Sequence, residues 1–153
     1  PEFEDAVTYD FANIDQHSQD ITKHELAQAN LIGFSDALTE PAMGLALKVI
    51  EHPRTEFIGL WQDDACIATA GVEYYQQTAT LITGSVLADQ RRRGIQSAMI
   101  LERLKIARDR GASYALIASS PGAATERNAL RLGARLVYHQ PVFVLTDASE
   151  EDL

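Results

Sequence analysis

The chain has 153 residues, of which 46% are hydrophobic and 23% charged, the size and balance of one globular domain with one buried core. Its 22 acidic residues outnumber its 13 basic ones, giving a formal net charge of −9, which disfavours nucleic acids and anionic membranes as partners. The single cysteine, Cys66, has no partner for an internal disulfide, and no Cys/His spacing indicates a metal site. The sequence shows neither a bilayer-spanning apolar run nor a signal-peptide pattern. We therefore expect a cytoplasmic protein without a metal, whose partner is a cationic small molecule or peptide.

The first third of the chain predicts two helices. Residues 1–20 are poorly defined, although an alternation of apolar residues within 7–11 favours a short strand. Apolar residues at helical spacing predict a helix over 21–36, after a cap-like side chain. A second helix begins near Glu40, where a proline follows in the first turn, and ends before Pro53.

The next segment predicts an antiparallel meander. Three short runs, 55–64, 65–77 and 78–89, are rich in β-branched and aromatic residues. The first two meet at Asp63 and Asp64, residue types that favour a turn.

The last third alternates helices and strands. Residues 95–110 form the clearest amphipathic helix of the sequence. Residues 113–120 have an unbroken apolar centre, which is typical of a parallel strand covered on both faces. A short helix over 124–132 stops at Gly133, and residues 134–145 predict a final pair of strands before an acidic tail.

The stretch DQRRRGIQSAM, residues 89–99, concentrates three arginines in this acidic chain. It lies between a predicted strand and a predicted helix, so free backbone N–H groups near Gly94 and the positive end of the helix dipole favour a phosphate. The spacing is neither that of a mononucleotide P-loop nor that of a dinucleotide fingerprint. From this local pattern alone, a solvated helix approach with Gly94 as a turn residue explains the stretch equally well.

The order of elements decides between these interpretations. Over about residues 55–145, the chain resembles the GNAT superfamily of acyl-CoA-dependent N-acetyltransferases. The resemblance lies in the order of a strand, the arginine-rich residues 89–94, which we call the arginine loop, a long helix, a buried strand and a short helix. The cofactor loop of that family reads Q/R-x-x-G-x-G/A, and residues 91–96 fit it except that Gln96 replaces the final small residue.

The resemblance implies a single domain over residues 1–153, with a three-layer α/β fold whose mixed, mostly antiparallel sheet is flanked by helices. It also implies that the pyrophosphate of acetyl-CoA lies over residues 91–97 and that the pantetheine arm follows the strand before them. The cofactor residues expected on this basis are Ser85, Val86, Leu87, Arg91, Arg92, Arg93, Gly94, Ile95, Gln96, Ser97 and Asn128. For Asn128, a local backbone hydrogen bond is an equally good interpretation.

In the family the substrate amine attacks the thioester directly, so the resemblance implies transfer of an acetyl group to a primary amine. Glu73 is the candidate base, although an exposed strand glutamate is an equally good interpretation. The position where many relatives carry a tyrosine as general acid is Ala129 here. Ser120, Tyr138 or solvent would have to protonate the leaving thiolate instead.

Two other functions stay open at this point. The departures at Gln96 and Ala129 suit a GNAT-like module that binds acyl-CoA without turnover, and a purely structural interaction domain ranks last. Residues 1–50 match the usual start of the family poorly. The chain could therefore be half of a tandem protein or complete its sheet as a homodimer.

Overall fold

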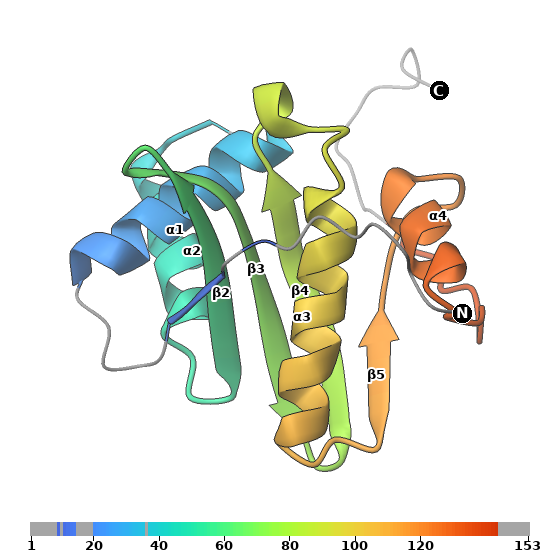
Figure 1. The fold of residues 1–153 in the computed structure, drawn as a ribbon. Coiled ribbons are helices and arrows are strands. Elements are labelled where there is room, and N and C mark those ends of the chain that lie inside the picture. Colours follow the sequence, from blue (N-terminus) through green and yellow to red (C-terminus); the bar gives the residue numbers. More distant parts are fainter. Residues whose placement is uncertain (1–8, 10, 15–19, 36, 144–153) are drawn as a thin grey trace.

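The structure, a computed structural model, describes residues 9, 11–14, 20–35 and 37–143 (Figure 1). Its sheet has the order β1-β2-β3-β4-β5, with β1 Ala12–Ile14, β2 Thr55–Gln62, β3 Ala65–Tyr75, β4 Thr78–Val86 and β5 Tyr114–Ile117. The helices are α1 Asp20–Phe34, α2 Glu40–Ile50, α3 Ile95–Asp109 and α4 Ala124–Arg131, with a 3₁₀ turn, η1, at Ala88–Gln90.

The architecture is the expected one. Strands β1 to β4 pair antiparallel and β4 pairs with β5 parallel, so the sheet is mixed and mostly antiparallel. Helices α1 and α2 cover one face of the sheet and α3 covers the other (Figure 1). The predicted three-layer α/β fold is confirmed.

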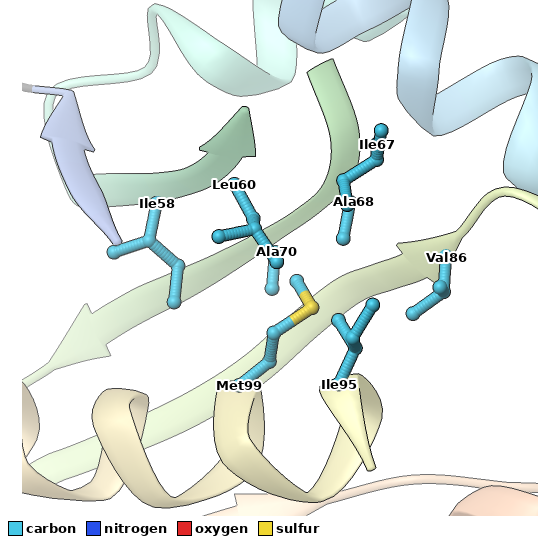
Figure 2. Packing of buried hydrophobic residues seen from close by; sticks show 8 residues of the cluster. All are labelled: Ile58, Leu60, Ile67, Ala68, Ala70, Val86, Ile95 and Met99. Carbon is cyan, nitrogen blue, oxygen red and sulfur yellow. The ribbon is translucent and has the colours of Figure 1, made fainter. Parts of the chain in front are cut away.

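Alternation along β2 supplies apolar side chains to both faces of the sheet. Phe57 belongs to the core cluster under α1 and α2, whereas Ile58 and Leu60 belong to the cluster under α3. Figure 2 shows Ile58 and Leu60 beside Met99 of α3. Because successive strand residues point to opposite faces, this single strand contributes to both hydrophobic layers.

The helix and hairpin predictions hold closely. Thr39 caps α2, since its Oγ1 accepts a hydrogen bond from the Ala42 N–H at 3.3 Å. Asp63 and Asp64 have φ angles of 50° and 63°, the left-handed pair that a two-residue hairpin turn requires. The predicted turn between β2 and β3 is thus confirmed.

The C-terminal part differs from the prediction. The strand β5 is not covered on both faces, and Tyr114 is 68% exposed. Within the described range, residues 134–143 form no strand, so the predicted final strand pair is wrong for them, while residues 144 and 145 lie outside the described residues. An apolar pattern alone does not make a strand, because a strand also needs a pairing edge, and these residues pair with none of the described strands.

The strand predicted within residues 7–11 lies largely outside the described residues. β1 begins at Ala12, after the segment 7–11, of which only residues 9 and 11 are described. Tyr9 and Phe11 pack against the core under α3.

None of the described helices has the length and apolar character needed to cross a membrane.

Met99 tests the packing of α3 on the sheet. Its side chain is 1% exposed, whereas Leu101 on the same helix is 37% exposed. We expect Met99→Ala to lower the free energy of unfolding by about 2–5 kcal/mol through a core cavity, and Leu101→Ala to lower it by about 1 kcal/mol or less. Urea denaturation of both variants measures the difference, and equal losses would contradict the proposed layer packing.

Candidate functional site

The sheet opens between β4 and β5. Their parallel pairing runs from Thr78↔Tyr114 to Leu81↔Ile117, but β4 continues to Val86. Beyond Leu81, the edge of β4 that faces β5 therefore has no strand partner among the described residues, and its backbone groups need another partner or water. The two strands therefore diverge beyond Leu81.

A pocket of about 590 Å³ lies at this opening. We call it the arginine pocket, because Arg91, Arg92 and Arg131 are among its lining residues. Most of the predicted cofactor residues line it: Ser85, Val86, Arg91, Arg92, Gly94, Ile95, Gln96, Ser97 and Asn128. Leu87 and Arg93 do not.

The start of α3 forms one wall of the arginine pocket. Gly94 is its N-cap, with φ of 81° and no side-chain cap, so the first N–H groups of α3 have no capping oxygen from a side chain. A Cβ placed on Gly94 would meet nothing within 4 Å, so the protein needs glycine here for the left-handed backbone. Arg92 also has a positive φ, of 61°, a second left-handed residue in the same short loop.

The predicted arginines have different roles in the structure. The Arg91 guanidinium donates to the Gly33 carbonyl at 2.8 Å and to the Val86 carbonyl at 3.2 Å, tying α1 to the end of β4. The Arg93 guanidinium donates to the side-chain oxygens of Gln62 and Gln90, and Arg93 does not line the arginine pocket. Arg92 shows no hydrogen bond or ion pair to the described residues, so its charge is available to a ligand.

Arg131 was not predicted. It lines the arginine pocket from α4 and, like Arg92, has no hydrogen bond or ion pair to the described residues. It follows Asn128 by three residues, a spacing that places both on one helix face. That spacing was the sequence signal that could have identified it.

Gln96, the residue that departs from the GNAT loop pattern, links two helices. Its Nε2 donates to Thr125 Oγ1 at 2.8 Å, and its Oε1 accepts a hydrogen bond from Asn128 Nδ2 at 2.7 Å. The side chain is therefore held against α4. Asn128 hydrogen-bonds to α3 rather than to its own backbone, and it lines the arginine pocket, as a cofactor residue would.

A second pocket, of about 520 Å³, lies between α1, α2 and the sheet. We call it the apolar pocket, because most of its described lining is hydrocarbon: Asn30, Leu31, Phe34, Ala37, Thr39, Ala42, Leu45, Ala46, Val49, Ile50, Phe57 and Thr83. Phe34 lines both pockets, and Thr83 of the apolar pocket precedes Gly84 of the arginine pocket on β4. The two pockets are therefore neighbours.

The structure does not bring the predicted catalytic residues to either pocket. The Glu73 carboxylate forms an ion pair with Arg54 at 3.1 Å, and Glu73 pairs across with Thr80, five residues before Ser85 or roughly 17 Å along β4. Ser120 and Tyr138 are exposed and line neither pocket. Sequence reasoning placed Glu73 on the correct strand but could not tell which end of the sheet it occupies.

The described lining residues of both pockets include no carboxylate, histidine or tyrosine. The buried carboxylate of Glu56 lies instead near the end of α3, where it pairs with Arg110 at 2.9 Å and accepts a hydrogen bond from Tyr74 at 3.3 Å. Burial and the nearby Glu56 charge raise the pKa of Tyr74 to about 12. In the part of the chain that the structure covers, no group of three or more His, Cys, Asp or Glu could hold a metal ion.

Arg103 fixes the irregular part of β4. The β3–β4 register shifts between Thr69 and Gly71, and the buried guanidinium of Arg103 donates at 3.2 Å to the carbonyls of both Gly71 and Ile82. Burial lowers the pKa of Arg103 to about 10. The apolar pattern of α3 gave no sign that an arginine lies on its buried face.

Comparison with known proteins supports the fold but no closer relationship. No protein-family model and no curated protein matches the sequence. A ribosomal-protein-alanine N-acetyltransferase from Brucella melitensis biovar Abortus 2308 is 18% identical with a TM-score of 0.70, over 90% of this chain and 99% of that one. The aminoglycoside N-acetyltransferase AAC(6')-Iy in complex with CoA is 12% identical with a TM-score of 0.69, over 91% and 95% of the two chains.

A third similar structure is a transcriptional regulator from Bacillus halodurans C-125, 12% identical with a TM-score of 0.70, over 89% of this chain and 100% of that one. Likeness at these identities shows a shared fold. The chain has the GNAT fold, the fold of the acyl-CoA-dependent N-acetyltransferases.

Arg103→Met tests the support of β4. The variant leaves the Gly71 and Ile82 carbonyls without their donor, and we expect the free energy of unfolding to fall by about 2 kcal/mol. Lys105→Met, on the exposed side of the same helix, should change it by less than about 0.5 kcal/mol. Urea denaturation of both variants measures this, and an unchanged stability of Arg103→Met would show that the two hydrogen bonds are dispensable.

Cys66 provides a pH-dependent test of burial. Burial raises the pKa of its thiol from 9.0 to about 11, and only the thiolate reacts with disulfide reagents. At pH 8 the native protein should therefore react about 100-fold more slowly than the unfolded chain, and its rate should still rise with pH up to about 11. Stopped-flow thiol titration with and without guanidinium measures both rates, and equal rates would mean that the thiol is accessible.

Proposed function

We propose that the protein is an N-acetyltransferase that transfers an acetyl group from acetyl-CoA to a primary amine. The observation that carries this proposal is the charge of the arginine pocket. Its described lining holds three arginines and no acidic side chain, in a chain whose net charge is −9. A cluster of positive charge beside an uncapped helix N-terminus suits a polyphosphate.

The residues of the arginine pocket fit coenzyme A in two parts. Arg92, Arg131 and the first turn of α3 would hold the pyrophosphate through charge and backbone N–H groups. The pantetheine arm would follow Ser85 and Val86, where the facing edge of β4 has no strand partner among the described residues. The CoA complex of AAC(6')-Iy, which shares the fold, supports this assignment.

The proposed reaction requires little chemistry from side chains. The neutral amine attacks the thioester carbonyl, a C–N bond forms, the C–S bond breaks, and the thiolate leaves and takes up a proton. The amine loses its proton to solvent, since the described lining residues include no carboxylate, histidine or tyrosine. The contribution of the protein is then to orient the two reactants, which lowers the entropic part of the barrier.

Arg131 tests the pyrophosphate site. We expect Arg131→Gln to weaken CoA binding about 10-fold, the loss of a hydrogen bond to a charged group worth roughly 1.5 kcal/mol. Arg135→Gln is the matched control, because Arg135 is exposed just beyond α4 and lines neither pocket. Isothermal titration with CoA and with ATP measures both variants, and the loss at Arg131 should shrink as KCl rises.

Failure of the wild-type protein to bind CoA would overturn the proposal, as would equal binding by all three proteins. A second candidate function is an acyl-CoA-binding module without turnover. It is favoured because the described lining residues of both pockets include no carboxylate, histidine or tyrosine that could transfer a proton. Selective CoA binding with no acetyl transfer to any amine of a broad panel would select that function.

A further inference from the structure

The apolar pocket has a chemistry unlike that of the rest of the surface. Its described lining residues carry no charge, although the chain has 22 acidic and 13 basic residues. Its volume of about 520 Å³ is in the usual range for small-molecule sites, which are mostly lined by hydrocarbon.

The polar groups in this lining are already engaged or buried. Asn30 Nδ2 donates to the Thr83 carbonyl at 2.7 Å, and Thr39 Oγ1 accepts the capping hydrogen bond at the start of α2. The Thr83 hydroxyl oxygen is buried and has no hydrogen-bond partner. The surface that the apolar pocket offers to a ligand is therefore mainly aliphatic and aromatic.

Large apolar side chains at the pocket are exposed to water. Phe34 is 51% exposed and Leu45 is 66% exposed, although both line the apolar pocket. Exposed apolar groups that surround a hollow indicate a ligand that covers them. The sharing of Phe34 with the arginine pocket places such a ligand next to the proposed acyl donor.

We propose that the apolar pocket binds the hydrocarbon part of the acceptor, so that the preferred substrates are primary amines with an alkyl or aromatic chain rather than polycations. This inference rests on the proposed acetyltransferase function and narrows the cationic acceptor expected from net charge to one with a single ammonium group on a hydrocarbon chain. The net charge attracts the ammonium group from a distance, but the described lining gives a second cation no partner and would strip it of water.

A series of monoamines and diamines of matched chain length tests the preference for a hydrocarbon chain over a second charge. The monoamines are butylamine, hexylamine and octylamine. The matched diamines are 1,4-diaminobutane, 1,6-diaminohexane and 1,8-diaminooctane, each of which adds a second terminal ammonium group to a chain of the same length. We expect kcat/KM to rise about 4-fold per added methylene in the monoamine series. Each diamine should be at least about 10-fold poorer than the monoamine of the same length, because its second ammonium would have to enter an apolar site.

Leu45→Asp is the informative variant, and Leu38→Asp is its control. Both leucines are exposed, so neither change opens a core cavity, but only Leu45 lines the apolar pocket. Leu45→Asp should lower kcat/KM for octylamine about 10-fold and raise it for the diamines, whereas Leu38→Asp should leave both unchanged. CoA affinity should be the same in all three proteins.

Direct titration of octylamine into the CoA-bound protein separates this inference from the proposed function. Acetyl transfer without a preference for chain length, or with better diamines, would overturn the inference and leave the acetyltransferase function intact. Octylamine binding that is weakened by Leu45→Asp would support the apolar site even if no transfer occurred. The absence of octylamine binding would overturn it.

Discussion

The hydrogen bonds of one buried cation hold the part of the sheet on which both pockets depend. The Arg103 guanidinium joins the carbonyls of Gly71 and Ile82, where the β3–β4 register changes. The next residue, Thr83, has a φ of 45°, which is unusual for a β-branched side chain within a strand. Without the Arg103 donor, the carbonyls of Gly71 on β3 and Ile82 on β4 would each lose a buried hydrogen bond where β4 leaves β5.

That irregular segment divides β4 into two parts with different partners. Up to Leu81 the strand pairs on both sides, with β3 and β5. From Ser85 onward it pairs only with β3 among the described strands. There α1 and the arginine loop also hold it, because the Ser85 hydroxyl donates to the Ala29 carbonyl at 3.4 Å and Arg91 donates to the Val86 carbonyl. A Cβ on Gly33 would lie 2.7 Å from Ser85, so glycine is required for this close approach of α1. The end of β4 is thus positioned by β3, α1 and Arg91, while its edge toward β5 has no strand partner among the described residues.

Local signals in the sequence predicted most helices and strands, but the contacts between elements distant in the sequence could not be predicted from it. The start of α2 near Glu40, the turn at Asp63 and Asp64 and the helix start at Gly94 all depend on neighbouring residues. The buried position of Arg103 depends on two carbonyls more than 20 residues away, and no periodicity encodes it. The position of Phe34 in the walls of both pockets likewise depends on how α1 packs against β4. The apolar pocket was therefore not predicted.

Phe34 gives the two pockets a common wall, and this has a thermodynamic consequence. Its half-exposed ring is in the lining of both, so a ligand that moves the ring in one pocket changes the shape of the other. The free energy of such coupling is reciprocal, and each ligand alters the affinity of the other by the same factor. A ligand that moved this single aromatic side chain in one pocket would therefore change the affinity of its neighbour.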